Sequence, residues 1–329
     1  MSFAAFAGID VGIDFLVLVT MDNQLSPAAP RKFANNKPGR TKLVRHLQQL
    51  NAPLQVCLEP TSNYHIKLAL ALHDASGITV SVVNPRALRD FAKSKMQRAK
   101  TDVCDAQILA WYGEAMKPRP WQPPRALAYQ LRSISRRLDD LTNRLTAVKN
   151  RKHSAQHGSA PACVIRDLKS EERSLAKRQE KLRQEALKLI AGDKAMSRRL
   201  ELLVSAKGVG EVSGIRLLAE LGTLPDGLGK EQWVAAAGLD PEPFESGKSI
   251  KGKRRISKQG NKHLRYALNA PALVAAHKCC EVNAYYEKLQ RRGVAKLAAL
   301  CAVMRKLLQA IWGMFQTNTP FDPNLFCRA

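Results

Sequence analysis

Four acidic residues in the first third of the chain have the types and spacing of a group that could act together. Asp10 follows a run of small and apolar residues, and Glu59 ends the apolar run QVCLE. Asp102 and Asp105 are three positions apart, so on a helix both carboxylates project from the same face. Taken singly, each acid is more typical of a solvated residue, or of a helix N-cap at Asp102. Adjacent strand ends and a helix packed across them would bring all four to one point.

Clustered carboxylates favour one kind of chemistry. They repel one another strongly unless a divalent cation neutralises them, and Mg²⁺ or Mn²⁺ prefers oxygen ligands. Two such ions about 3.5–4 Å apart stabilise the attacking and leaving oxygens of a phosphodiester displacement. The four acids therefore predict a magnesium (or manganese) site that processes nucleic-acid phosphodiesters.

The charge of the whole chain indicates the same class of substrate. Its 329 residues include 53 lysines and arginines against 28 aspartates and glutamates, a formal net charge of +25. This surplus favours a polyanion, most simply DNA or RNA, and the basic segment 86–100 supplies Arg98 and Lys100 as candidate contacts. An anionic membrane would need an amphipathic basic helix or a lipid anchor. We expect no membrane association, since no apolar stretch reaches the length of a bilayer span and MSFAAFAGIDVG lacks the positive region of a signal peptide.

A basic run near the C-terminal end is the second candidate site. Residues 243–268 read PFESGKSIKGKRRISKQGNKHLRYAL, and no acid follows Glu245. Eight cations there are predicted to grip phosphates: Lys248, Lys251, Lys253, Arg254, Arg255, Lys258, Lys262 and Arg265. Charge alone does not account for Ser246, which stands between Glu245 and Gly247.

The elements that must position the four acids are those of a layered α/β domain over residues 1–120. Apolar runs at 5–9 and 15–20, together with RKFAN, QVCLEP and TVSVVNP, are typical of strands. Leu43, Leu47 and Leu50 share one face of a helix, and further helices are predicted over 65–75 and 102–116. Mixed strands and helices of this kind imply helices layered on a sheet. The proline-rich KPRPWQPPR at 117–125 is typical of a linker.

Residues 121–196 are predicted to form a coiled-coil helical hairpin. The first helix carries apolar residues at alternating spacings of four and three: Leu127, Leu131, Ile134, Leu138, Leu141, Leu145 and Val148. Gly158 and Pro161 interrupt the pattern, after which leucines recur every seven residues at Leu168, Leu175, Leu182 and Leu189. The hairpin would be a spacer or an oligomerisation arm. For its second half, a helix packed on its own domain is nearly as well supported.

Residues 197–329 are predicted to form a mainly α C-terminal domain. Short helices flank Gly208-Val209-Gly210, which suits a helix-hairpin-helix-like element whose exposed amides hold a phosphate, although an ordinary helix connection fits comparably. The closing helix over 294–315 has the stripe of a core helix. Seven cysteines without a CxxC pair or zinc spacing are predicted to be mostly buried thiols, which favours a reducing cytoplasm.

Several short motifs carry a resemblance to a known family. They are GID at 8–10, LEPT at 58–61, KTDVCDA at 100–106, and the G-L-x-P, E-S-G and R-I-S-K-x-G-N elements within 238–268. In this order they resemble the insertion-sequence transposases of the family numbered one hundred and ten. Those proteins combine a RuvC-like domain carrying four acids (DEDD) with a second, serine-bearing transposase domain. The resemblance covers essentially the whole chain.

This resemblance implies a fold, a mechanism and partners. Residues 1–120 would be a RuvC-like, ribonuclease-H-like domain in which Asp10, Glu59, Asp102 and Asp105 ligate magnesium. Ser246 would attack a DNA phosphate and form a covalent phosphoserine link, so that the protein acts as a transposase or site-specific recombinase in the cytoplasm. A non-coding RNA from the same element would pair with donor and target DNA. Strand exchange holds several DNA ends together, so a homo-oligomer, dimer or tetramer, is expected.

The chain departs from the family pattern at three places, and other functions stay open. Ser62 stands where glycine is common, Ile13-Asp14 where lysine is frequent, and Lys207 where the turn usually has proline. One alternative is a metal-dependent RuvC-like nuclease or Holliday junction resolvase in which Ser246 only contacts a phosphate. Another is a non-catalytic nucleic-acid-binding scaffold. Ser249 and Ser257 are rival hydroxyls, of which Ser257 better suits a cap or a phosphate contact.

Overall fold

The computed structural model describes residues 3–21, 27–97, 99–242, 245–246, 250–251 and 255–326, with the backbone alone at 245–246 and 250–251. The chain folds as two compact units, residues 1–123 and residues 124–329. The predicted hairpin and the predicted C-terminal domain both lie in the second unit. Their separation at residue 196 stays a prediction.

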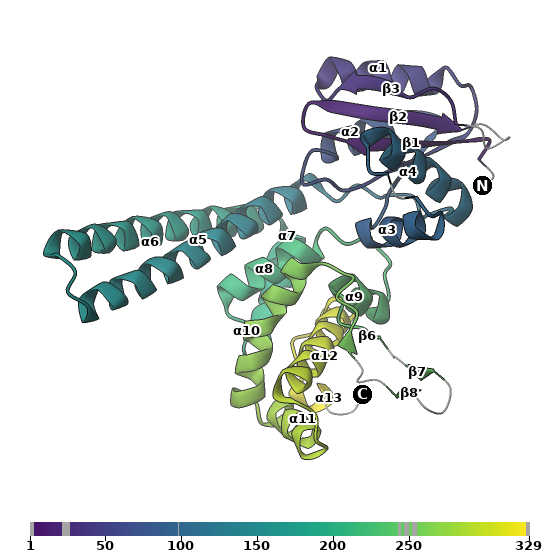
Figure 1. The fold of residues 1–329 in the computed structure, drawn as a ribbon. Coiled ribbons are helices and arrows are strands. Elements are labelled where there is room, and N and C mark those ends of the chain that lie inside the picture. The colour runs from purple at the N-terminus through teal and green to yellow at the C-terminus, as the bar shows by residue number, and fades with distance from the viewer. Residues whose placement is uncertain are drawn as a thin grey trace. The chain divides into compact units, whose positions relative to one another are not determined.

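A five-stranded mixed sheet forms the centre of the first unit (Figure 1). Its strands, in the order β3-β2-β1-β4-β5, are β1 (Ala5–Val11), β2 (Phe15–Met21), β3 (Arg31–Ala34), β4 (Leu54–Leu58) and β5 (Ile78–Val82). β1 runs antiparallel to β2 and parallel to β4, and β4 runs parallel to β5. The prediction of an α/β first domain is confirmed, with every predicted strand present.

Helices cover both faces of this sheet. α1 (Lys37–Gln48) and α2 (Ile66–His73) pack with Ala7 and Ile9 of β1, burying leucines at 43, 47, 68 and 72. Because strand side chains alternate between faces, Gly8 and Asp10 belong to the opposite face. There α4 (Asp102–Met116) contacts the strand, and α3 (Pro85–Ser94) packs beside α4.

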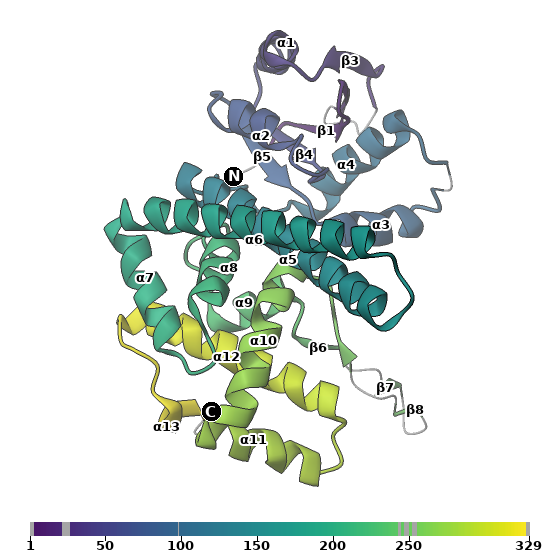
Figure 2. The ribbon, with the colours of Figure 1, turned by 90° about the vertical axis from the view of Figure 1, so that its left-hand side faces the viewer.

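Two long helices open the second unit. α5 (Ala126–His157) and α6 (Ala162–Ala191) run side by side in both views (Figures 1 and 2). Buried Leu141, Val148 and Leu175 form their shared seam, with Leu145, Leu168 and Leu182 packed against it. Toward the base the seam changes: Ala186 and Ile190, not Leu189, are buried, and they belong to the core of the C-terminal helices. That end of α6 agrees with the alternative prediction for the second half of the hairpin, a helix packed on its own domain.

The rest of the second unit is mainly helical, as predicted. Its helices are α7 (Lys194–Ser205), α8 (Glu211–Leu221), α9 (Lys230–Ala237), α10 (Lys262–Lys278), α11 (Cys280–Arg291), α12 (Lys296–Thr317) and α13 (Pro323–Phe326). By length and composition α12 alone among the described helices could cross a membrane, but one such helix is weak evidence. Its apolar stripe, including Val303, Leu307 and Ile311, lies within the core, as predicted for the closing helix.

Four two-residue strands join α9 to α10. β6 (Pro241–Glu242) pairs antiparallel with β9 (Arg255–Ile256), and between them β7 (Glu245–Ser246) pairs antiparallel with β8 (Ile250–Lys251). Ser246 therefore lies on the inner pair of a two-tier hairpin, opposite Ile250.

The cysteine prediction was partly wrong. The six cysteines within the described residues are free thiols, but only Cys57 and Cys279 are buried, while Cys163 and Cys280 are exposed. Burial raises the pKa of the Cys57 thiol to about 12, so this thiol stays protonated and packs as a small apolar group.

Candidate active site

Parallel pairing of β1 with β4 places the first two acids side by side. Ile9 is in register with Leu58, so Asp10 and Glu59 are the next residues along the two strands. Both side chains are half-buried at the carboxyl ends of the strands. Parallel strands present their carboxyl ends at one edge of a sheet, which is where sites form in open α/β sheets.

A glycine in β1 determines how close α4 comes to this edge. A Cβ on Gly8 would lie 1.9 Å from the carbonyl oxygen of Ala106 and 2.5 Å from the amide nitrogen of Ala110. The backbone of α4 therefore rests directly on β1, on the face that Asp10 shares. Gly113, further along α4, makes a similar approach to the Cys57 thiol of β4, 2.9 Å from a built Cβ.

The first turn of α4 carries the other two acids. Thr101 is the N-cap, and its hydroxyl accepts a hydrogen bond from the Cys104 amide at 3.2 Å. The alternative that Asp102 itself caps the helix is wrong, because Asp102 is the first helical residue. Its side chain is exposed and that of Asp105 is half-buried. Asp102 and Asp105 are thus left available for a role other than capping.

The acids influence one another electrostatically. Burial, followed by the charges of Asp102 and Asp105, raises the pKa of Asp10 from 3.8 to about 6. Burial and the charge of Asp105 raise the pKa of Glu59, and burial and the charge of Asp102 raise that of Asp105. Together with the register of β1 and β4 and the contact of α4 with β1, these effects indicate that the fold brings the four predicted acids into one neighbourhood.

Two cations lie within electrostatic range of the acids. Lys100, one of the predicted contacts, lowers the pKa of Glu59 and of Asp105, and Arg89 of α3 lowers that of Glu59. Both side chains are exposed. The sequence pointed to the segment 86–100 but not to Arg89 in particular, which follows the buried Leu88 in α3. Arg98 lies outside the described residues.

The donor set suits a hard cation. All four candidate ligands are carboxylates, and a bound cation would oppose both the burial and the repulsion that raise the pKa of Asp10. Among the residues that the structure describes, no three or more His, Cys, Asp or Glu side chains are arranged to hold one ion. The carboxylates are therefore neighbours rather than a preformed cage.

Ser62 shows how this edge tolerates a departure from the family pattern. It has φ 50°, in the left-handed region that favours glycine. Serine there costs about 1–2 kcal/mol relative to a relaxed backbone. The loop after Glu59 thus keeps the turn that glycine would favour.

In the second unit, the motif residues G-L-x-P and R-I-S-K-x-G-N form one compact frame. Gly238 has φ 61°, and a Cβ on Gly260 would lie 2.2 Å from the Ala236 carbonyl oxygen, so both glycines are required by close backbone approach. The Ser257 hydroxyl donates to Asp240 at 2.6 Å and is buried. The same hydroxyl accepts from the Gln259 amide at 3.3 Å, so these local contacts account for Ser257, while the N-cap of α10 is Asn261.

The predicted phosphate-binding cations have different surroundings. Arg255, Lys258 and Lys262 are exposed. Arg265 is half-buried, and its guanidinium donates to the carbonyl oxygens of Ala237 and Gly260 at 2.7 and 3.1 Å, so the fold accounts for it. Of the remaining candidates, Ser246 and Lys251 are described by their backbone alone, and Lys248, Lys253 and Arg254 lie outside the described residues.

The glycine turn between α7 and α8 has a packing role. Gly208 has φ 100°, and a Cβ there would lie 2.5 Å from the Pro271 carbonyl oxygen of α10. Gly210 is the N-cap of α8, makes no side-chain cap and is exposed. Close packing explains the first glycine, whereas a phosphate at the second stays a prediction.

Comparisons with known proteins agree with these observations. Residues 7–159, which contain all four acids, match a transposase family model for the DEDD domain of IS110 elements. Residues 200–287, which contain Ser246 and the basic run, match the model described as the transposase IS116/IS110/IS902 family. The two matched regions fall on the two ends of the chain where the sequence motifs lie.

Individual relatives extend the likeness. The chain is 27% identical over 301 residues to the pilin gene-inverting protein of Moraxella bovis, covering 89% of this chain and 90% of that protein. It is also 26% identical over 127 residues to an uncharacterized 42 kDa protein of the insertion element IS900 from Mycobacterium paratuberculosis, covering 38% of this chain and 32% of that protein. Together the two domain matches and these relatives support a DNA-rearranging enzyme, an insertion-element transposase of the IS110 family.

Proposed function

We propose that this transposase cuts and rejoins DNA with two sets of groups, the four acids of the first unit and Ser246 of the second. The observation that carries the proposal is the placement of the acids: Asp10 and Glu59 lie at the adjacent carboxyl ends of β1 and β4, and Asp102 and Asp105 lie on the first turn of α4, which rests on β1. These residues would hold Mg²⁺ or Mn²⁺. When bound, the metal supplies charge stabilisation for the phosphoryl oxygens.

The chemistry of the serine is a phosphoryl exchange. The Ser246 hydroxyl oxygen forms a bond to the scissile phosphorus, and one bridging P–O bond of the DNA breaks. The serine proton passes to a base or to water, and the departing DNA oxygen takes up a proton. Attack on the phosphoserine by a hydroxyl of another DNA end then restores a phosphodiester and frees the serine. Because the phosphodiester is exchanged for a phosphoserine ester and is not hydrolysed, rejoining the DNA needs no external energy source.

The remaining parts of the proposal concern partners. The net charge of +25 and the exposed cations Arg255, Lys258 and Lys262 support contacts with nucleic-acid backbone. A guide RNA, a homo-oligomer and a cytoplasmic location are proposed from the family resemblance. The pilin gene-inverting relative suggests that this chain, too, rearranges DNA.

Mapping of a covalent adduct tests the proposal. The protein is given a suicide DNA substrate whose nicked strand diffuses away after cleavage, then denatured and digested. We expect a phosphorylated peptide whose modified residue is Ser246, and we expect chelation of divalent metal to prevent its formation. Modification at Ser249 would transfer the role to that hydroxyl. Cleaved DNA with no protein adduct would instead support the nuclease or junction resolvase.

Metal binding is expected to depend on pH. The folded-state pKa of Asp10, about 6, is above its ordinary value of 3.8, so in metal-free protein this group adds stability that is complete below pH 3.8 and is lost as pH rises through 6. A metal needs the ionised form. Added Mg²⁺ should therefore raise the melting temperature of the protein above about pH 7 and have little effect near pH 5. Ca²⁺ serves as a comparison ion, and equal stabilisation by Mg²⁺ at both pH values would contradict the assignment of Asp10 as a ligand.

A further inference from the structure

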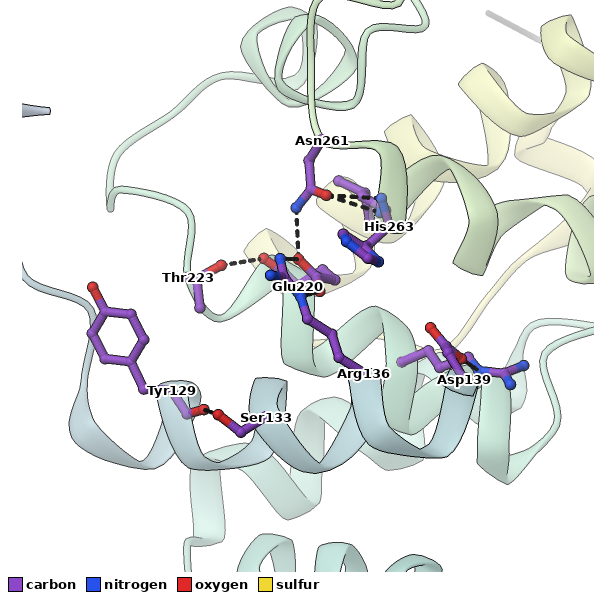
Figure 3. A network of polar contacts seen from close by, with 10 residues as sticks. Tyr129, Ser133, Arg136, Asp139, Glu220, Thr223, Asn261 and His263 are labelled. Atoms are coloured by element: carbon purple, nitrogen blue, oxygen red, sulfur yellow. Dashed lines mark hydrogen bonds and ion pairs between the residues drawn. The ribbon is translucent and has the colours of Figure 1, made fainter. Parts of the chain in front are cut away.

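One carboxylate in the second unit is buried outside the proposed catalytic groups. Glu220 of α8 is 2% exposed. Arg136 of α5 donates to it through Nε at 3.0 Å and through Nη2 at 3.3 Å, and Asn261 donates through Nδ2 at 2.6 Å (Figure 3). Glu220 thus joins the foot of the long hairpin to the residue that begins α10.

Asn261 performs two tasks with one side chain. Its Oδ1 accepts from the amides of His263 and Leu264, at 2.9 and 3.3 Å, and so caps α10. Its Nδ2 is then directed to Glu220. The backbone amide of Asn261 donates to the Ala236 carbonyl oxygen at 2.6 Å. The end of the loop 257–261 is therefore fixed from three sides.

This loop leads directly to the strands that carry Ser246. The Lys258 amide donates to the Gly238 carbonyl at 3.1 Å, and the Ser257 amide donates to that of Asp240 at 2.9 Å. Ser257 follows β9, which pairs with β6, and the inner pair β7–β8 lies between them in the chain. The base of the two-tier hairpin is thereby set by the loop that Glu220 holds.

An ion pair whose carboxylate is buried, like that of Glu220 with the 37% exposed side chain of Arg136, is a poor means of adding stability. Well-packed apolar residues in its place are often neutral or better, because desolvation offsets the attraction. What a carboxylate does supply is direction: the two oxygens of Glu220 fix the fork of Arg136 and the amide of Asn261 at once. This combination favours a role in geometry over a role in stability.

We infer that Glu220 is a positioning residue for the nucleophile, acting through Asn261 and the loop 257–261. This inference rests on the proposed function, since it concerns the rate at which Ser246 attacks DNA. A displacement of about 1 Å at a reacting group can slow a reaction about 100-fold. The long hairpin of α5 and α6 would then influence the rate of attack by Ser246 through Arg136.

A second ion pair between α5 and α8 provides a control for the test. Asp139, one turn further along α5, pairs with Arg216 of α8 at 2.5 Å, and Arg216 also donates to Thr142 at 3.2 Å. Asp139→Asn thus weakens the same α5–α8 junction without removing a hydrogen bond to Glu220 or Asn261. The test variants are Glu220→Gln and Asn261→Ser, because serine still caps a helix but cannot donate to Glu220 from the same position.

Two measurements on the full chain are made in each variant: the single-turnover rate of adduct formation with saturating suicide DNA, and amide hydrogen exchange over 255–261. We expect Glu220→Gln and Asn261→Ser to slow adduct formation about 10- to 100-fold, with DNA affinity changed less than about threefold. Hydrogen exchange over 255–261 should rise in both variants. Because both substitutions break the same Asn261–Glu220 contact, the double variant should form the adduct no more slowly than the slower single variant. Asp139→Asn should keep the wild-type rate.

Two results would overturn the inference. One is a wild-type adduct rate in Glu220→Gln and Asn261→Ser, even if exchange rises, because the network would then be structural only. The other is an equal slowing in Asp139→Asn, which would assign the effect to the α5–α8 junction as a whole. Both leave the wild-type adduct at Ser246 intact, whereas absence of that adduct in the wild type would remove the proposed function and, with it, this inference.

Discussion

Replacing Asp10 with asparagine is expected to reduce DNA cleavage about 1000-fold and, at the same time, to stabilise the metal-free first unit. Loss of one oriented group that stabilises charge in a transition state typically costs a factor of this size. The expected stabilisation has a different cause, the removal of an unfavourable charge. Above pH 6 the ionised Asp10 is partly buried beside Asp102 and Asp105, which is unfavourable, and asparagine removes that charge.

The size and pH range of the stabilisation follow from the pKa of Asp10. A rise from 3.8 to about 6 corresponds to at most about 3 kcal/mol, and partial exposure reduces the expected gain to about 1–2 kcal/mol. The gain should be complete above pH 6 and absent below pH 3.8, where Asp10 is protonated in both the folded and the unfolded chain. Urea unfolding at several pH values, without metal, measures it.

Asp14 provides the control for this experiment. It is an exposed aspartate at the end of the same β1–β2 turn. Asp14→Asn should change neither cleavage nor the free energy of unfolding by more than about 0.5 kcal/mol. If Asp10→Asn instead destabilised the metal-free protein at pH 8, Asp10 would be a structural hydrogen-bonding group and not one of a repelling cluster.

The sheet and the position of the acids could be predicted because local signals agree there. Apolar runs mark the strands, and the limits of α4 coincide with the Thr101 cap and with Lys117, a left-handed C-cap followed by Pro118. The side-by-side placement of Asp10 and Glu59 then follows from parallel pairing. The sequence pattern could not predict the direct contact between Gly8 and the backbone of α4, since a glycine two residues before an aspartate can have many other roles.

The second unit was less predictable because its decisive contacts are remote in sequence. Asn261 meets Glu220 across 41 positions, and Glu220 meets Arg136 across 84. Within the basic run, Arg265 has the same charge as Lys258 and Lys262, yet its guanidinium is directed into the fold while theirs face solvent. Charge predicts a surface for phosphate, but only packing separates the cations that hold the loop from those left to bind.

Gly8→Ala is expected to destabilise the first unit by about 3 kcal/mol or more and to disperse the four acids. The added methyl group would lie 1.9 Å from the Ala106 carbonyl and 2.5 Å from the Ala110 amide, and both are backbone atoms that cannot rotate away. Overpacking of a fitted core costs about 1–3 kcal/mol, and a clash with helix backbone belongs at the upper end. The helix must therefore move off β1 and take Asp102 and Asp105 with it.

Hydrogen exchange over 102–116 and the pH titration of Asp10 measure the two consequences. Exchange should rise across α4, and the pKa of Asp10 should fall from about 6 toward its ordinary range as the neighbouring charges recede. Gly113→Ala is the matched control at the same interface, because its methyl group meets side chains and no backbone, the Cys57 thiol at 2.9 Å and the Phe6 ring at 3.7 Å. Alanine also favours a helix by about 1 kcal/mol relative to glycine. If both variants behaved alike, close contact at Gly8 would not be what gathers the acids. If only Gly8→Ala lowers the pKa and abolishes cleavage, the geometry of one glycine accounts for the assembly of the carboxylates.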